Sequence, residues 1–570
     1  MTNGNSTTET ANSLSTVARV GWGALILATL TVCYFSNLGA IGFVGPDEPR
    51  YAWIARDMAE TGDWVTPRLY GKPWFEKPVL YYWMAGTSFK LFGVSEAAAR
   101  LPSALCALFA TLALAWLASR VYGGETARWL LVLLPTSVGM IGFSHAAATD
   151  MPFSAMVTIA MVCAAVALGL ARNESTPILP RTPWLALLLF GFFLGLAVLA
   201  KGPAGIILCG GAVFFWAIFT KRWQDAFRLL HPASILSFCA TALPWYILCA
   251  RRNPDFFRVF IIEHNFKRYL TPEFQHIQPF WYYVPVLLVA FLPWAIPLVW
   301  VVVAKRAGIT KEGRSEHLQL LFWLGAIFCF LFFSASKSKL PGYVLPAILL
   351  IGFLFAREFS LLVNTNRKLL CWLSIGGAAP FMGAAFVFGW VLHRPTVALQ
   401  AQADGIAVVC AFFSLPLLLI WCHFRGKPKA TDSLRSQMFC AATYCVALLL
   451  LRFPLALIDQ DVSSRYLANV VSERKIVPIG QIRSYHLERA RNYQISFYFH
   501  QELKEFDLAE NNVRGVITSL SGAEELIRSG VRLGRHIYGG GLKNEASFDE
   551  ILPSNSTDGS AGGGQVRQEK

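Results

Sequence analysis

Apolar stretches of helix length dominate the sequence between residues 19 and 458. Runs such as "WGALILATLTVCYFSNLGAIGF" and "FWYYVPVLLVAFLPWAIPLVWVVVA" approach the ~20 residues that a helix needs to cross a bilayer core. Because backbone groups in lipid must be hydrogen-bonded within their own segment, these runs predict helices rather than strands. The pattern predicts about thirteen membrane-spanning helices, near residues 19–41, 97–119, 126–144, 149–171, 183–200, 203–220, 228–249, 280–304, 318–336, 340–357, 369–392, 405–423 and 437–458.

The remainder of the chain changes character after the last apolar stretch. The strand-like runs "ISFYFH" and "GVITSL" and the helical run "GAEELIRSG" predict a small mixed α/β domain outside the membrane. We therefore expect an α-helical polytopic membrane protein with a small C-terminal α/β domain. The expected parts are a cytoplasmic segment 1–18, a membrane domain 19–458 with outer loops 42–96 and 250–279, a C-terminal outer domain 459–552 and a flexible tail 553–570.

Composition supports this interpretation. Of the 570 residues, 55% are apolar and only 15% are charged, which argues against an ordinary soluble enzyme. The 12 cysteines lie in or at the ends of apolar stretches without CxxC spacing, so they indicate neither a disulfide framework nor a zinc site. No nucleic-acid-binding motif accompanies the net charge of +15.

Basic residues predict the orientation of the helices. The short loops 221–228, 305–314, 357–368 and 424–435 are rich in Lys and Arg and alternate onto one face, which is then cytoplasmic. The outer face receives the two long loops, the corners around Asp150, Lys201 and Lys337–Lys339, and the polar C-terminal part. We therefore expect the functional site on the outer face.

The first outer loop, "GPDEPRYAWIARDMAETGDWVTPRLYGKPWFEKPVLYYW", is rich in ionisable and aromatic groups. Asp47 and Glu48 stand at a helix start beside the membrane, a plausible catalytic position, although capping of that helix would explain them equally well. Glu76 and Lys77 place an acid and a base side by side, and Lys77 is suited to hold a phosphate. The aromatic residues that follow are also typical of a headgroup belt.

Other outer segments add charges of both signs. Asp150 opens a helix, where it is either a cap or part of a site. The 250–279 segment carries Glu263, His264 and Arg268, and a guanidinium group suits bidentate binding of phosphate. Lys337 and Lys339 occupy an outer corner against the positive-inside rule, which indicates an anionic ligand. Carboxylates beside cations predict a site that handles a sugar and holds a phosphate.

With these motifs in view, the chain resembles the lipid A aminoarabinose transferases, the undecaprenyl phosphate-aminoarabinose arabinosyl transferases, within the GT-C group that includes the protein O-mannosyltransferases. The resemblance rests on several motifs taken together, which are "GPDEPRYAWIARDM", "GDWVTPRLYGKPWFEKPVLYYW", "AARLPSAL", "LAKGPAG", "LPWYILCARRNPDF", "EHNFKRY", "PFWYYVPV" and "SKSKLPGYVLPA".

The resemblance implies a GT-C bundle of thirteen helices in a Gram-negative inner membrane, with a periplasmic active site. It implies a pentosyltransferase that moves 4-amino-4-deoxy-L-arabinose from undecaprenyl phosphate to a lipid A phosphate, with resistance to polymyxin and cationic peptides. A monomer in contact with membrane lipids, with no nucleic-acid partner, is expected. No cofactor is expected to be required, although Glu76 and His264 are candidate ligands for a divalent metal; a hydrogen-bonding role for His264 is the alternative.

The candidate residues follow from the motifs and the resemblance together. Asp47 matches the family's catalytic position after the first helix, and Asp150 matches its position in the third loop. Since a lipid A phosphate is already anionic near neutral pH, we expect Asp47 to position the acceptor or stabilise positive charge on the sugar. The candidates are Asp47, Asp150 and Glu76 for catalysis, Lys77, Arg268, Lys339, Lys337 and Tyr343 for the donor phosphate, and Glu48, Arg50, Tyr51, Tyr81, Tyr82 and His264 for substrate binding.

Two alternatives stay open at this point. A related GT-C glycosyltransferase with another sugar or acceptor would share the bundle and the acidic loop. A transporter of lipid-linked sugar would instead place acidic residues and broken helices at mid-membrane, whereas here the charges gather at one outer rim.

Overall fold

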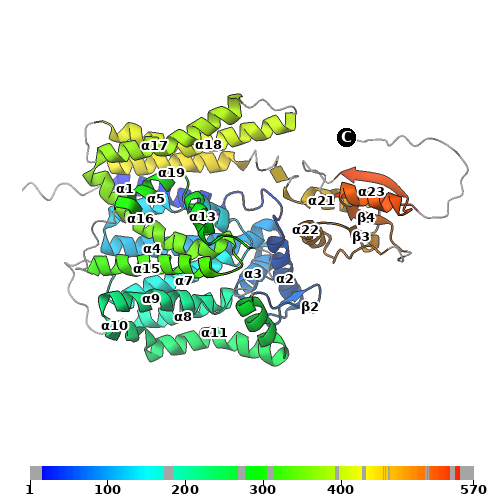
Figure 1. Cartoon of the computed structure of the whole chain (residues 1–570), viewed down its shortest axis with the longest axis horizontal. Coiled ribbons are helices and arrows are strands. Elements are labelled where there is room, and N and C mark those ends of the chain that lie inside the picture. The colour runs from blue at the N-terminus through cyan, green and yellow to red at the C-terminus, as the bar shows by residue number, and fades with distance from the viewer. Residues whose placement is uncertain are drawn as a thin grey trace, which may run out of the picture. The chain divides into compact units, whose positions relative to one another are not determined.

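The computed structural model describes residues 16–171, 184–267, 277–304, 314–391, 397–426, 432–452, 455, 458–459, 462–507, 510, 512–538 and 546–552. The chain divides into two compact units (Figure 1). The first comprises Met1–Ala40 and Tyr51–Ala456, and the second comprises Ile41–Arg50 and Leu457–Lys570. The boundary near residue 457 is close to the predicted one, but the sequence does not indicate that Ile41–Arg50 joins the C-terminal part.

The first unit is almost entirely helical. Its principal helices are α1 (Thr16–Phe35), α2 (Asp47–Thr61, which starts in the second unit), α3 (Leu80–Phe92), α4 (Glu96–Val121), α5 (Gly124–Leu133), α6 (Val138–Ser144), α7 (Asp150–Ala167), α8 (Trp184–Lys201), α9 (Ala204–Thr220), α10 (Trp223–Phe227), α11 (Pro232–Arg252), α13 (Tyr283–Ala290), α14 (Ala295–Ala304), α15 (Arg314–Ala335), α16 (Leu345–Thr365), α17 (Arg367–Phe386), α18 (Val397–Phe424) and α19 (Asp432–Leu450). Short elements complete it: strands β1 (Arg68–Leu69) and β2 (Lys72–Pro73), the π-helical segments η2 (Arg258–Lys267) and η6 (Val387–Val391), and the 3-10 turns η1 (Arg228–Leu230), η3 (Phe280–Tyr282) and η5 (Pro341–Val344).

The helices confirm the membrane prediction. Among the described residues, nine helices are long and apolar enough to cross a bilayer, and two bent pairs raise the number to eleven. Two shorter apolar helices, Val20–Phe35 and Ala204–Thr220, lie at the remaining predicted positions. Each predicted span therefore has a counterpart, and the chain is a multi-span membrane protein.

Two spans predicted as single helices, 126–144 and 280–304, are instead broken. The first bends by 66° between α5 and α6, and the second by 119° between Ala290 and Ala295. The two breaks satisfy each other's polar groups: the Trp294 indole N–H donates to the Thr136 hydroxyl at 3.0 Å, and the Val138 N–H donates to the Leu292 carbonyl at 3.1 Å. Irregular backbone is tolerated at such depth when protein groups replace the lost helical hydrogen bonds.

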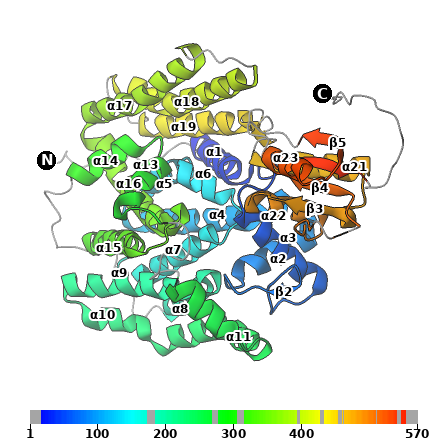
Figure 2. The same ribbon diagram turned by 45° about the vertical axis from the view of Figure 1, so that its right-hand side comes forward.

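Helix α7 lies at the centre of the first unit. It contacts α4, α8 and α16, and 89% of its residues are buried in the unit (Figure 2). Small residues such as Ala155, Ala160 and Ala164 are fully buried, which permits close approach of neighbouring helices. Helices α8, α9 and α11 lie side by side along one edge of the unit (Figure 1). The N-terminus of α7, which carries Asp150, is thereby held among several helix ends.

The second unit is a small α/β fold. Its four-stranded sheet has the order β3-β4-β6-β5, with β3 and β4 parallel and the other pairs antiparallel. Its elements are α21 (Arg465–Arg474), η7 (Ile479–Gln481), β3 (Ile482–Tyr485), α22 (Arg489–Phe499), β4 (Gly515–Thr518), α23 (Leu520–Arg528), β5 (Leu533–Tyr538) and β6 (Ser547–Ile551). Its core includes Leu467, Val471, Ile482, Ile495, Ile517 and Phe548.

The sequence prediction for this unit is correct for β4 and α23 but wrong for "ISFYFH", which lies in helix α22. The reason is that α22 buries apolar side chains on more than one face. Ile495 faces the core, while Phe497 and Tyr498 pack on Phe43, with ring centroids 4.7 and 6.2 Å away. A helix covered on two sides loses the single apolar stripe that distinguishes it from a strand.

Candidate functional site

The candidate residues near the start of α2 belong to the second unit. The Asp47 carboxylate accepts a hydrogen bond from Arg50 Nη2 at 2.6 Å; Arg50 is nearly buried, whereas 47% of the Asp47 side chain is exposed. Glu48 Oε2 accepts the backbone N–H of Val44 at 2.8 Å. Glu48 is therefore the residue that binds a backbone N–H just before the helix. Arg50 holds the Asp47 carboxylate, which stays partly exposed to solvent.

Asp150, at the N-terminus of α7, forms a second arrangement, in the first unit. Its Oδ1 accepts a hydrogen bond from Lys201 Nζ at 2.5 Å, and Lys201 ends α8. The same ammonium lies 4.4 Å from the centroid of the Tyr343 ring, which belongs to η5. Lys201 thus links Asp150 to Tyr343, one of the residues predicted to bind the donor phosphate. It forms a hydrogen bond with Asp150 and a cation-π contact with the Tyr343 ring.

Gly342 makes this approach possible. A Cβ atom at this position would lie 2.5 Å from Asp150 Cγ and 2.6 Å from its Oδ1. No side chain fits there without moving the carboxylate or the turn. Lys201 and Gly342 are absent from the residues predicted for the site, although "LAKGPAG" and the lysine on the outer face were available signals.

Glu76 and Lys77 lie side by side in the loop before α3. The Lys77 ammonium is 3.5 Å from Glu76 Oε1, and the two side chains are only 11% and 8% exposed. Because the two charges neutralise each other, an anionic ligand could replace Glu76 as the partner of Lys77.

Tyr51, Tyr81 and Tyr82, three of the residues predicted to bind substrate, form a buried cluster, so Tyr81 and Tyr82 do not lie in a headgroup belt. Tyr81 and Tyr82 are fully buried, and Tyr51 is 3% exposed. The three rings lie with centroids 6.1 Å apart, and the Tyr81 hydroxyl donates to the Ala99 carbonyl at 2.9 Å. Their position joins α2, α3 and α4; substrate contact by these residues stays a prediction.

Two lysines in the corner between α15 and α16 differ in their exposure to solvent. Lys337 is exposed, whereas Lys339 is 6% exposed and donates to the carbonyls of Ser336 at 2.6 Å and Gln278 at 3.0 Å. Burial, followed by the charge of Lys337, lowers the pKa of Lys339 below its ordinary value. Lys339 therefore connects the α15–α16 corner to the residues before η3, and Lys337 presents its charge to solvent.

The segment after α11 is only partly described. Arg268 lies outside the described residues. His264 is half-buried in the π-helical segment η2, where Glu263 pairs with Arg258 at 2.8 Å. Within the described ranges, no group of three or more His, Cys, Asp or Glu side chains is arranged to hold a metal. A metal bound by Glu76 and His264 stays a prediction.

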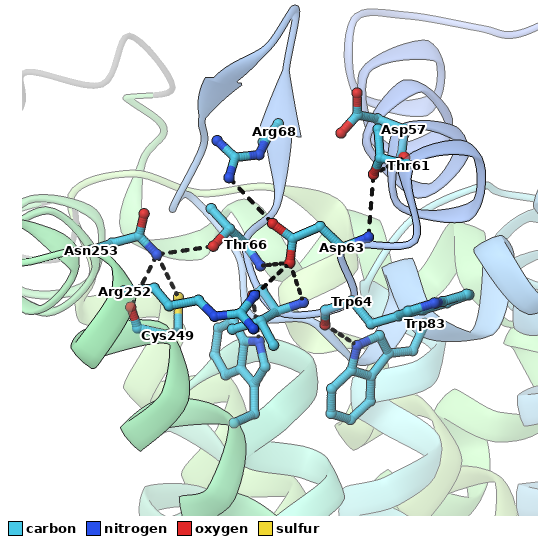
Figure 3. Close-up of polar contacts among 12 residues, drawn as sticks. Asp57, Thr61, Asp63, Trp64, Thr66, Arg68, Trp83, Cys249, Arg252 and Asn253 are labelled. Atoms are coloured by element: carbon cyan, nitrogen blue, oxygen red, sulfur yellow. Dashed lines mark hydrogen bonds and ion pairs between the residues drawn. The ribbon is translucent and has the colours of Figure 1, made fainter.

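Asp63, a residue that the sequence analysis did not single out, organises the loop between α2 and α3 (Figure 3). Its carboxylate accepts the N–H groups of Val65 and Thr66 at 3.1 and 3.3 Å. It also pairs with Arg68 at 3.2 Å and with Arg252, at the end of α11, at 3.0 Å. Partial burial acts to raise the pKa of this carboxyl, but the hydrogen bonds and the two guanidinium charges outweigh it and lower the pKa.

Sequence comparisons identify relatives of this chain. Residues 22–260 match the family described as dolichyl-phosphate-mannose-protein mannosyltransferase. An undecaprenyl phosphate-alpha-4-amino-4-deoxy-L-arabinose arabinosyl transferase of Enterobacter sp. (strain 638) is 32% identical over 349 residues, 61% of each chain. The corresponding protein of Edwardsiella ictaluri is 33% identical over 352 residues, again 61% of each. The matched stretch thus spans less than two thirds of these relatives.

The fold also has a solved counterpart. The crystal structure of ArnT from Cupriavidus metallidurans bound to undecaprenyl phosphate aligns with a TM-score of 0.73 at 22% identity, covering 94% of this chain and 99% of that one. Its apo structure aligns with a TM-score of 0.72. The chain therefore shares the fold of these polytopic membrane proteins. The two sequence relatives carry the name of the undecaprenyl phosphate-aminoarabinose arabinosyl transferases, which this chain's motifs resemble.

Proposed function

We propose that this protein is a glycosyltransferase that moves 4-amino-4-deoxy-L-arabinose from undecaprenyl phosphate to a phosphate of lipid A. The observation that carries the proposal is the 32–33% identity to relatives named for this sugar and this lipid carrier. The family match over residues 22–260 includes Asp47, Glu76, Lys77 and Asp150, four of the residues to which we assign a role in this reaction.

In the proposed reaction, the bond between the sugar's anomeric carbon and the donor phosphate oxygen breaks, and an acceptor phosphate oxygen forms the new bond. The leaving undecaprenyl phosphate takes the bonding electrons, so cations are needed where its charge accumulates. Lys77, Lys337, Lys339 and Arg268 are our candidates, with the Tyr343 hydroxyl as a hydrogen-bond donor. Lys201, close to Tyr343, is added to this set from the geometry.

The carboxylates receive different roles. A phosphate monoester acceptor is largely deprotonated near neutral pH, so a strong general base is unnecessary. We assign Asp47, with Arg50 and Glu48 beside it, to positioning the acceptor or stabilising positive charge on the sugar ring. Asp150 and Glu76 are assigned to the donor, whose ammonium group a carboxylate recognises. A divalent metal held by Glu76 and His264 would add a further positive charge for the phosphate, but the reaction as written does not need it.

The cellular consequence follows from charge. Attaching an aminosugar to a lipid A phosphate reduces the negative charge of the cell surface, which weakens binding of polymyxin and cationic peptides. We place the protein in the inner membrane of a Gram-negative bacterium as a monomer, with this chemistry on the periplasmic side. A transferase of the same class with another lipid-linked sugar is the second candidate, because the matched family model is that of mannosyltransferases.

Mass spectrometry of lipid A tests the proposal. A host lacking such a transferase but supplying the lipid-linked donor is expected to gain the aminoarabinose mass when it expresses this chain, and to lose it with Asp47→Asn. Glu60→Gln, which removes the charge from an exposed pair with Arg56 on the same helix, is the matched control and should leave the mass shift intact. An unmodified lipid A with wild-type protein in the membrane would favour the second candidate.

A further inference from the structure

The segment that leads into Asp47 belongs to the second unit, which we call the C-terminal unit because Leu457–Lys570 forms most of it. More than 400 residues of sequence separate the two parts of this unit. The Gly42 N–H donates to Asp459 Oδ1 at 2.6 Å, across 417 positions. The next N–H, of Phe43, donates to the Tyr498 hydroxyl at 3.1 Å, and the Phe43 ring packs on Phe497. Two successive backbone groups and one side chain are thus held by α22 and the residues before α21.

Asp459 is itself fixed in orientation. Its Oδ2 accepts two hydrogen bonds from Arg465, at 3.1 Å from Nε and 2.7 Å from Nη2, and its Oδ1 also accepts the Ser463 hydroxyl at 2.8 Å. A carboxylate whose two oxygens are held separately, Oδ2 by Arg465 and Oδ1 by Ser463, has little rotational freedom. The oxygen that receives Gly42 is therefore presented in one position.

The other side of Asp47 is held by the same unit. Arg50, which pairs with the Asp47 carboxylate, lies with its guanidinium carbon 5.9 Å from the centroid of the Tyr493 ring on α22. Arg50 is 4% exposed, so its direction is determined by packing rather than by solvent. The part of this unit that follows residue 457 thus contacts the chain both before and after Asp47.

The chain packs so closely at Gly42 that no side chain fits there. A Cβ atom there would lie 2.5 Å from the Ser463 hydroxyl oxygen, 2.7 Å from Ser463 Cβ and 2.7 Å from the Tyr498 hydroxyl oxygen. Such distances require the segment or the unit to shift, because real Cβ atoms are not found so close to other heavy atoms. The contact is therefore sensitive to a single added methyl group.

From these contacts we propose that the C-terminal unit sets the orientation of the Asp47 carboxylate, with Asp459, Tyr493 and Tyr498 as positioning residues. The inference rests on the proposed function of Asp47 and assigns a role to a domain whose role the sequence left open. None of the three residues needs to touch substrate. They act through the backbone of Gly42 and Phe43 and through the guanidinium group of Arg50.

The test uses the purified full-length chain and measures kcat and KM with the lipid-linked donor, together with binding of undecaprenyl phosphate alone. Gly42→Ala and Asp459→Ala are each expected to lower kcat roughly 10- to 100-fold, since displacement of a reacting group by about 1 Å costs this much. KM for the donor and binding of undecaprenyl phosphate are expected to stay within about threefold, because a misdirected carboxylate impairs the transition state more than the ground state. Tyr498→Phe, which removes one oxygen atom, should give a smaller loss of kcat.

Two matched controls separate positioning from folding. Glu510→Ala removes another carboxylate of the same unit, one that accepts two hydrogen bonds from Arg483 rather than binding the Gly42 backbone. Gly480→Ala adds a methyl group at a position where the nearest side-chain atom, Gln501 Nε2, is 4.0 Å away. Both should keep wild-type kcat. Adding Ser463→Gly to Gly42→Ala removes two of the three close atoms and is expected to restore part of the lost kcat.

The outcomes distinguish the two proposals. If wild-type protein transfers the sugar and Asp47→Asn does not, the proposed function stands; wild-type kcat in both Gly42→Ala and Asp459→Ala would then overturn the positioning role. Equal losses in the Glu510 and Asp459 variants would also overturn it, because general destabilisation of the unit would explain both. Failure of the wild-type chain to transfer the sugar would refute the proposed function itself. Undiminished transfer by Asp47→Asn would leave that function standing but overturn the role of Asp47, and with it the positioning role of the C-terminal unit.

Discussion

Gly342 determines how closely Asp150 approaches the turn that carries Tyr343. We expect Gly342→Ala to displace the Asp150 carboxylate from Lys201, because the new Cβ would lie 2.5 Å from Asp150 Cγ. Transfer activity should fall by about 10-fold or more, and the free energy of unfolding by about 1–3 kcal/mol. Activity assays and thermal unfolding check both effects. Gly383→Ala, in open space within α17, is the control; equal behaviour of the two variants would contradict the role of Gly342.

Asp63 should make stability depend on pH. Its folded-state pKa is lowered, so it stabilises the fold at pH values above the ordinary carboxyl pKa of ~3.9. That contribution is lost as the pH falls through the lowered folded-state value. Asp63→Asn should reduce stability at neutral pH by about 1–3 kcal/mol through weaker hydrogen bonding to the loop.

The measurement is thermal unfolding of the wild type and Asp63→Asn from pH 7 downward, to the most acidic pH the detergent tolerates. The gap between the two proteins is expected to narrow as the pH falls below ~4. A gap that is constant with pH would mean that the Asp63 charge does not contribute. Asp255→Asn is the control, since that carboxylate is 75% exposed and its arginine partner, Arg258, is 61% exposed.

At the scale of elements, a polar cluster joins helix ends remote in sequence. Asp432 begins α19 with its side chain 3% exposed, and it accepts Arg367, at the start of α17, at 2.7 Å. His423, near the end of α18, lies 3.3 Å from its other oxygen. We expect Asp432→Ala to destabilise the protein on the order of 3 kcal/mol, because the Arg367 charge loses a buried partner. Unfolding measurements should show under about 1 kcal/mol for Glu60→Ala, whose pair is exposed.

Elements determined by a local pattern could be predicted from the sequence, whereas those that depend on distant contacts could not. Every predicted span has a counterpart because apolar length is a local property. The two bends were missed because they depend on Thr136 meeting Trp294, 158 residues away, which no local pattern encodes. Likewise "ISFYFH" was assigned to a strand, since its second apolar face is explained only by Phe43.

At the scale of the whole molecule, the orientation in the membrane is testable. Lys337, predicted outside, and Lys221, predicted inside, are both exposed. In a Cys422→Ser background, which removes the one exposed cysteine of the described chain, a membrane-impermeant thiol reagent should label Lys337→Cys in whole cells. Lys221→Cys should react only after permeabilisation. The reverse pattern would invert the topology and place the candidate residues in the cytoplasm.

The motifs located candidate residues without revealing how they are arranged. Asp47, Glu76, Lys77 and Asp150 were recognised because the sequence surrounding each is distinctive. Partners were not: Lys201 reaches Asp150 only through the packing of α8 on α7. Spatial pairing between segments is a property of the fold, and a single sequence does not contain it explicitly.

The bond between Gly42 and Asp459 has a consequence for protein synthesis. At the 5–20 residues per second of translation, about 20–80 s separate the appearance of these two residues. During that interval the first membrane helix is already made, but the chain beside Asp47 lacks the groups that hold it. The surroundings of this carboxylate are therefore completed only after the last membrane helix has been synthesised, so that an unfinished chain in the membrane would not yet hold the Asp47 segment in place.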